Sequence, residues 1–180
     1  MRVSLAATAA ILVTFACADQ PLTSPDALSV SPNFDANPVT DMVSAGSNDA
    51  CAAFGQPNGC DKNFSFHANM KADGSVTGQY QDGFSTQFPN DGIHATIDCL
   101  NIVGNGAVVS GVITRGQQFG VDVTGQSILT AVVDNGTSAN DPADQISFSF
   151  NDIDLTCDQL VPANFPLFEI GPGQVRVKQK

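Results

Sequence analysis

The chain has 180 residues, with 18 acidic and 7 basic side chains and a formal net charge of −11 at pH 7. Nucleic-acid binding requires clustered Lys and Arg, so this charge argues against a nucleic-acid partner. The length suits one domain behind a leader and a tether, and acidity carried by seventeen Asp and a single Glu favours strands joined by turns over helices.

Residues 1–18 have the pattern of a secretory signal peptide: Arg2 near the start, an apolar run, and small residues at the end. Ala16-Cys17-Ala18 fits simple cleavage, whereas Phe15-Ala16-Cys17 resembles a bacterial lipoprotein site in which Cys17 carries the lipid. Thr14 departs from the Leu that such a site usually has. We expect an exported protein, either a membrane-anchored lipoprotein or a secreted or periplasmic one.

Residues 19–48 are rich in Pro, Ser, Thr, Asp and Asn and lack a sustained apolar period. Such a stretch cannot bury enough surface to offset its ordering entropy, so it predicts a disordered linker. Residues 49–180 then form the folded domain.

Four cysteines follow the leader: Cys51, Cys60, Cys99 and Cys157. An even set in an oxidising compartment favours disulfides. The short segment between Cys51 and Cys60 can close a compact loop, in which case Cys99 and Cys157 would join distant strands. The alternative is that some of these cysteines are buried free thiols.

The domain reads as strands between tight turns. In residues 63–71, Phe64, Phe66, Ala68 and Met70 alternate with polar residues, and Asp73-Gly74 then favours a hairpin. The further predicted strands are residues 76–81, 84–88, 93–102, 107–114, 127–133, 145–150, 153–157 and 174–177.

Successive short connections predict an all-β antiparallel meander that closes into a small barrel, with a β-sandwich as the alternative. A small barrel is either filled by side chains or holds one apolar molecule. The candidate lining of such a ligand cavity consists of Phe64, Phe66, Phe84, Phe88, Phe148 and Phe150.

Catalytic and metal motifs are weak, and no cofactor is predicted. His94 and Asp98 share a strand face and are candidates for a general base and its orienting carboxylate in a hydrolase or isomerase. His67 lies on a polar face of its own strand. Asp134, Asn135, Asp141 and Asp144 offer oxygens for calcium, although an ordinary long hairpin loop has the same composition.

Residues 99–107, Gly111, residues 133–136 and residues 144–146 resemble an uncharacterised group of bacterial secreted and lipoprotein β-domains, over roughly residues 64–157. The resemblance implies export, a β-rich fold and a link between Cys99 and Cys157, but no activity.

The sequence therefore predicts a noncatalytic envelope or extracellular β-domain whose loops bind an unidentified ligand or partner. The alternative function is a lipocalin-like barrel that binds a small hydrophobic ligand. An enzyme that uses His94 and Asp98 is a third hypothesis.

Overall fold

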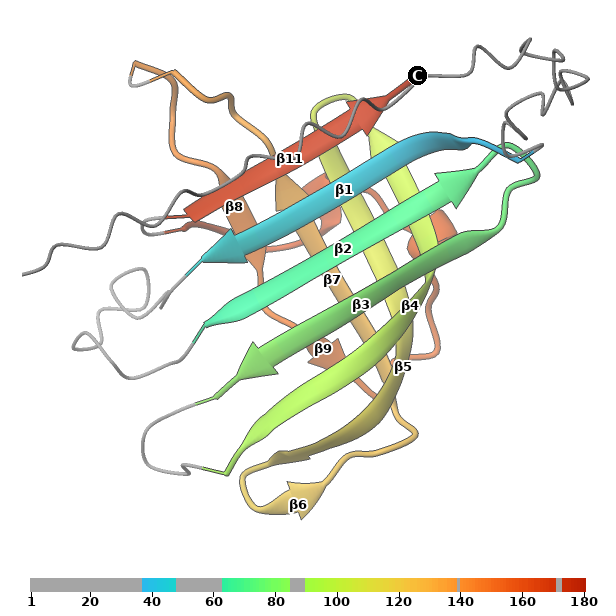
Figure 1. Cartoon of the computed structure of the whole chain (residues 1–180). Coiled ribbons are helices and arrows are strands. Elements are labelled where there is room, and N and C mark those ends of the chain that lie inside the picture. The colour runs from blue at the N-terminus through green and yellow to red at the C-terminus, as the bar shows by residue number, and fades with distance from the viewer. Residues whose placement is uncertain (1–36, 48–62, 85–89, 139, 171–172) are drawn as a thin grey trace, which may run out of the picture. The chain divides into compact units, whose positions relative to one another are not determined.

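The computed structural model describes residues 37–47, 63–84, 90–138, 140–170 and 173–180. This part of the chain is all-β and antiparallel, as the sequence predicts. Nine strands form one curled sheet in the order β10-β8-β7-β5-β4-β3-β2-β1-β11, while β6 pairs with β5 and β9 pairs with β7 (Figure 1). No helix among the described residues is long and apolar enough to cross a membrane.

The bounds of the elements are β1 (Val39–Ser47), β2 (Phe64–Lys71), β3 (Val76–Gly83), β4 (Gly92–Val103), β5 (Gly106–Gln118), β6 (Val121–Asp122), β7 (Ser127–Val133), β8 (Gln145–Ser147), β9 (Phe150–Asn151), the 3-10 helices η2 (Cys157–Gln159) and η3 (Pro162–Asn164), β10 (Leu167–Glu169) and β11 (Gly173–Gln179).

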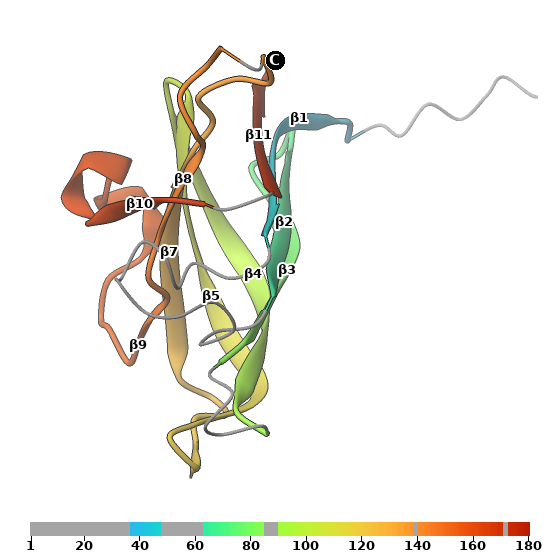
Figure 2. The ribbon, with the colours of Figure 1, turned by 90° about the vertical axis from the view of Figure 1, so that its left-hand side faces the viewer.

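The curled sheet forms two facing layers. Figure 2 shows β11, β1, β2 and β3 on one side and β5, β7 and β8 on the other, with β4 passing between them. The pairing of β4 with β5 has two bulges, at His94/Ala95 and at Ile97/Cys99. Because a bulge bends its strand and increases the local twist, these two bulges let the longest strands turn from one layer to the other.

The two ends of the sheet are brought together by the chain itself. β10 and β11 are the terminal strands of the order, yet only residues 170–172 separate them in sequence. Four Cα–Cα steps reach at most about 15 Å. The sheet must therefore curl until its edges face each other, which gives a half-barrel rather than an open sheet.

β1 lies inside the stretch predicted as linker, residues 19–48, so the domain begins earlier than the sequence predicts. Val43 is fully buried, and β1 pairs with both β2 and β11. The inward positions of β1 are Asp41, Val43, Ala45 and Ser47, so its apolar alternation is only two residues long. An alternation of two apolar residues is too short to predict a strand.

The interior between the layers is filled by side chains from both of them. Fully buried members include Val43, Ala68, Ile93, Ala107, Val132 and Val175. Phe66 stacks on Tyr80 with ring centroids 5.8 Å apart and belongs to the same cluster. The phenylalanine-rich side of residues 63–71 thus faces the core, as the alternation predicts.

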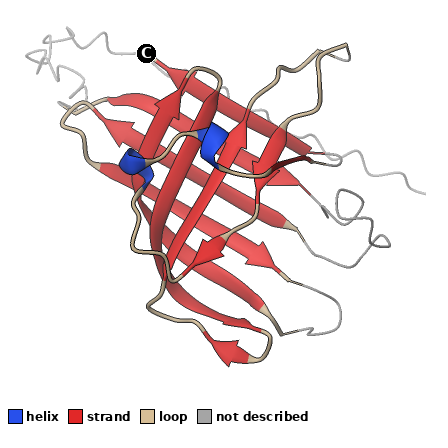
Figure 3. Cartoon of the chain, turned by 180° about the vertical axis from the view of Figure 1, so that it is seen from behind, coloured by secondary structure: helices blue, strands red, loops and turns tan. Residues whose placement is uncertain are grey.

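A second apolar cluster lies on the other face of β5 and β7. It contains Val108, Leu129, Ala131 and Cys157, with Leu160, Phe165 and Leu167 packed against it. The chain from η2 to β10 covers this face, where both 3-10 helices are seen in Figure 3. Since β5 is covered on both sides, residues 106–111 are buried without alternation.

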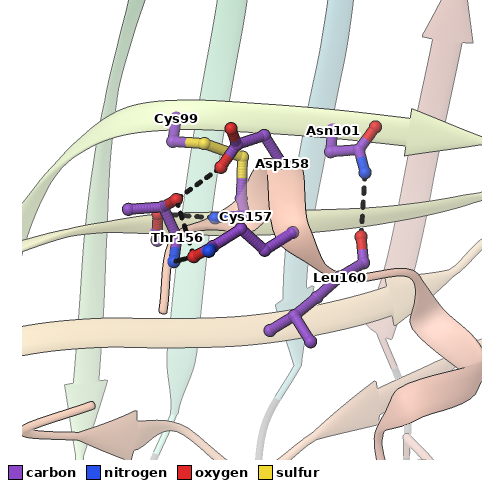
Figure 4. The surroundings of a disulfide bond; sticks show 8 residues. Cys99, Asn101, Thr156, Cys157, Asp158 and Leu160 are labelled. Atoms are coloured by element: carbon purple, nitrogen blue, oxygen red, sulfur yellow. Dashed lines mark hydrogen bonds between the residues drawn. A yellow bond between two sulfur atoms is a disulfide. The ribbon is translucent and has the colours of Figure 1, made fainter. Parts of the chain in front are cut away.

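A disulfide joins Cys99 to Cys157 and fastens this covering segment to β4 (Figure 4). The two Cα atoms are 5.8 Å apart. Cys157 N–H also donates to Ser110 Oγ at 3.1 Å, and Asn101 Nδ2 donates to the Leu160 carbonyl at 2.8 Å. The predicted pairing of Cys99 with Cys157 is confirmed, whereas Cys51 and Cys60 lie outside the described residues.

Three predicted elements differ from the structure. Asp82 and Gly83, which separate the predicted strands 76–81 and 84–88, continue β3, and residues 85–89 are outside the described chain. The predicted strand 145–150 is divided into β8 and β9, and residues 153–157 form no strand. The division follows Ser147, whose Oγ replaces a backbone carbonyl as the acceptor of Ala131 N–H at 2.9 Å.

Candidate functional site

An aromatic hollow opens at one end of the half-barrel, between the ends of β3 and β5 and the β8–β9 segment. We call it the mouth; its volume is about 260 Å³. The aromatic side chains that line it are Phe64, Tyr80, Phe84, Phe119, Phe148 and Phe168. Asp82, Gln118 and Ser147 add polar groups, and Tyr80 Oη donates to Asp82 Oδ2 at 2.8 Å.

Three of the six predicted ligand-lining residues meet at the mouth: Phe64, Phe84 and Phe148. Phe66 is buried in the main core. Phe150 belongs to the second cluster, where its ring centroid lies 5.9 Å from that of Phe165. The sequence placed Phe148 and Phe150 on one face of a continuous strand, and the break after Ser147 separates them. Phe88 lies outside the described residues.

Phe119 and Phe168 complete the mouth and were not predicted. Phe168 packs edge-on against Phe148 with ring centroids 5.0 Å apart. Phe119 occupies the two-residue turn between β5 and β6, where it is 74% exposed. The sequence signal available for Phe119 is a bulky apolar residue next to Gly120, between the predicted strands 107–114 and 127–133.

The backbone at Phe119 is unusual for its residue type. Phe119 has φ 52° and Gly120 has φ 74°, so both turn positions are left-handed, as a type I′ hairpin requires. Asn, Asp and Gly normally fill the first of these positions because a Cβ atom is strained there. The turn is held by Asp91, which is buried and accepts from Gly120 N–H at 3.3 Å.

A different hollow lies on the outward face of β2, β3, β4 and β5, with a volume of about 400 Å³. It is lined by His67, Gln79, Gln81, His94, Thr96 and Arg115 among others. Arg115 Nη2 lies 2.9 Å from His94 Nε2. Because a guanidinium only donates, Nε2 accepts and the imidazole carries its proton on Nδ1. Burial and then the charge of Arg115 lower the pKa of His94.

The two histidines do not form a joint centre. His67 is on β2 and His94 on β4, with β3 between them, and they are offset by two residues along the strands, so their backbones are about 12 Å apart. His94 and Asp98 are four residues apart on one strand, about 13 Å along its axis. The hydrogen bond of the imidazole is to Arg115, so the geometry does not provide the His94–Asp98 pair considered for a hydrolase or isomerase.

Of the four residues considered for calcium, the three carboxylates accept backbone N–H groups, and Asn135 Nδ2 donates to the Ala143 carbonyl at 2.7 Å. Asp144 accepts from Asn135 at 2.8 Å and from Val175 at 2.6 Å, and Asp134 accepts from Val177 at 2.9 Å and from Gly136 at 3.1 Å. Asp141 accepts from Ser138 N–H at 2.8 Å. Among the described residues, no group of three or more His, Cys, Asp or Glu side chains could hold a metal ion.

No protein-family model, curated protein or solved structure matches this chain. The resemblance to bacterial exported β-domains therefore stays a prediction. Cys17 lies outside the described residues, so its lipidation also stays a prediction.

The mouth is equipped for apolar contact. Ser147 and Ser149 supply hydroxyl groups there, but both histidines of the chain lie on the outward face, so the mouth contains no imidazole base. Aromatic rings with a few polar groups at the rim are typical of small-ligand sites. The arrangement can bury a ring or a short acyl chain and hydrogen-bond its polar end.

Proposed function

We propose that this chain is an exported, noncatalytic binding domain that takes a small apolar ligand into its aromatic mouth. The observation that carries the proposal is the convergence of five phenyl rings on one hollow, two of them substantially exposed. Phe119 is 74% exposed and Phe148 is 48% exposed. Clustered exposed aromatic surface is unfavourable in water and is typical of binding sites.

The size of the mouth limits the ligand. Sites for drug-sized molecules usually measure roughly 300–1,000 Å³. The mouth has about 260 Å³, so it suits one ring system or one short acyl chain. Tyr80, Asp82 and Gln118 favour a ligand with a hydroxyl or amine at one end. The buried core between the layers supports binding at the rim rather than inside a deep lipocalin-like cavity.

Export is the second part of the proposal. It is supported by the leader-like residues 1–18 and by the disulfide between Cys99 and Cys157, because disulfides persist in oxidising compartments. A lipid on Cys17 would anchor the domain to a membrane through residues 19–36, and cleavage without lipid would release it.

A neutral fluorescent probe, N-phenyl-1-naphthylamine, tests the mouth directly. We expect its fluorescence to rise on binding and Phe148→Ser to weaken the affinity by about tenfold, since a partly buried phenyl contact contributes about 1.4 kcal/mol. Leu155→Ser is the matched control, because Leu155 is 42% exposed and lines none of the hollows described above. Equal affinity of both variants, with unchanged circular dichroism, would contradict the proposal.

A further inference from the structure

A carboxylate stands among the aromatic rings of the mouth. Asp82 lies near the end of β3, where it is half-buried and has the same inward parity as Tyr80. Its register partners are Phe64 on β2 and Ile93 on β4, which are 7% and 0% exposed. An inward strand position between two buried apolar residues ordinarily takes an apolar side chain, because burying a charge is costly. Asp82 departs from this rule at the point where the mouth opens.

A buried phenol orients this carboxylate. Tyr80 Oη donates to Asp82 Oδ2 at 2.8 Å, and Tyr80 is 2% exposed. The Tyr80 ring stacks in turn on Phe66 in the main core. An ionised carboxylate has about four acceptor sites, so the phenol uses only part of its capacity. Asp82 is thus an acceptor whose position is set by the core, and a ligand that binds to it does not have to order it.

The charges around the mouth favour a cation. Among the described residues that line the mouth, Asp82 is the only charged side chain. An adjoining hollow of about 470 Å³ shares Asp82 and adds Asp91, Asp122 and Arg115, so three carboxylates stand against one guanidinium. The chain as a whole has a net charge of −11. This balance attracts a cationic ligand to the mouth and disfavours an anionic one.

The rings of the mouth provide a second attraction for the same charge. The faces of aromatic rings are negative, so an ammonium group within about 6 Å of a ring centroid is attracted to the ring. Phe119 and Phe148 have exposed surface at the mouth, and Phe168 packs edge-on against Phe148. An apolar amine can place its hydrocarbon part among these rings and its ammonium group against Asp82. A neutral ligand lacks the second contact, and an anion would be repelled.

We propose that the mouth selects the ammonium form of an apolar amine, with Asp82 as the counter-ion and the phenyl rings around the hydrocarbon part. This inference rests on the proposed function, because it assigns the charge of the ligand that the mouth takes. The volume of about 260 Å³ limits the ligand to one ring or short chain beside the ammonium group. Charge-assisted hydrogen bonds are roughly twice as strong as neutral ones, so the ammonium is preferred over an alcohol of the same shape.

Three small ligands of similar shape test the selection of charge: cationic phenethylammonium, neutral phenethyl alcohol and anionic hydrocinnamate. Each is titrated against the full chain as a competitor of N-phenyl-1-naphthylamine at pH 7, where the amine is protonated. We expect phenethylammonium to bind at least about tenfold more tightly than the alcohol, which corresponds to about 1.4 kcal/mol, and hydrocinnamate to bind most weakly. Added salt should weaken the binding of phenethylammonium and not that of the alcohol.

Asp82→Asn should bring the affinities for phenethylammonium and the alcohol to within about twofold of each other. Asp98→Asn is the matched control, since it removes the same charge from an exposed position of β4 outside the mouth, and it should keep the preference. An equal loss of preference in both variants would show that net charge alone matters and would overturn the proposal.

The ligand series on the unmodified protein needs no variant, so it does not depend on the folding of Asp82→Asn. Equal affinities for phenethylammonium and the alcohol, or tighter binding of hydrocinnamate, would overturn the inference. If the naphthylamine binds and the ammonium is not preferred, the assigned charge is wrong while the proposed function stands. If the naphthylamine does not bind at all, the proposed function is wrong and this inference is overturned with it.

Discussion

Phe119 combines two features that are each unfavourable for stability. Its ring is 74% exposed, and its backbone is left-handed at φ 52°. For a residue with a Cβ atom, the left-handed conformation costs about 1–2 kcal/mol relative to the right-handed one. Strained residues of this kind concentrate at functional sites. Phe119 lines the mouth together with Phe148, so the turn holds its ring where a bound ligand would contact it.

Replacing Phe119 should separate the role of the ring from the strain of the backbone. Asn tolerates the left-handed conformation, so Phe119→Asn should raise the free energy of unfolding by about 1 kcal/mol while weakening binding at the mouth. Phe119→Ala retains the strain and should weaken binding without the gain in stability. Urea unfolding and naphthylamine titration of both variants measure these effects. A Phe119→Asn variant less stable than the unmodified protein would show that contacts of the ring outweigh the strain.

The β4–β5 pair determines how the sheet turns between its layers. Gly111 on β5 lies beside the bulge at Ile97/Cys99, where the two strands approach closely. A Cβ atom at Gly111 would lie 1.9 Å from the carbonyl oxygen of Thr96, which is backbone and cannot move aside. The absence of a side chain at this position is therefore a condition for the bend.

Gly111→Ala tests this dependence of the bend on close approach. We expect it to lower the free energy of unfolding by at least about 3 kcal/mol, because an inserted methyl group must displace backbone. Gly46→Ala is the matched control. Its Cβ would lie 3.7 Å from the nearest atom, and Ala in a strand is usually about 0.5–1 kcal/mol more favourable than Gly. Similar urea midpoints for the two variants would refute the role assigned to Gly111.

Alternation predicts those strands that have one clear apolar face. The range 63–71 was predicted in this way and matches β2. β1 was missed because Asp41 and Ser47 occupy two of its inward positions. The covering of β5 by the 157–167 segment was also missed, since a distant segment that buries a second strand face leaves no period in the strand itself. At the site, the phenylalanines of the predicted strands include Phe64, Phe84 and Phe148, which line the mouth. Phe119 and Phe168 reach the mouth only through the tertiary structure.

At the scale of the whole domain, side chains rather than a backbone ladder join the two ends of the sheet. The free edge of β11 directs the N–H groups of Val175 and Val177 to the carboxylates of Asp144 and Asp134, at the two ends of the β7–β8 connection. Ile170 N–H donates to the Asp144 carbonyl at 2.9 Å. Exposed strand edges invite pairing with other chains, so these carboxylates protect an edge that the ladder leaves open. The composition that suggested a calcium loop reflects this use of acidic oxygens.

We call these contacts between β11 and the β7–β8 connection the seam. Asp144→Asn should show how much the seam contributes to the free energy of unfolding. Asp144 is 7% exposed and both of its oxygens accept N–H groups, so the amide nitrogen of Asn would face a donor. We expect the free energy of unfolding to fall by about 2–3 kcal/mol, the effect of leaving a buried partner of a charged acceptor unsatisfied. The amide of Val175 should exchange its hydrogen faster, while amides of β2 should change only with global stability. Asp141→Asn is the control, because Asp141 is exposed and, among the described residues, its hydrogen bonds are to Ser138 in its own loop. If Val175 exchanged at the same rate in both variants, β11 would be held by its pairing with β1 alone, and the seam would have no part in closing the half-barrel.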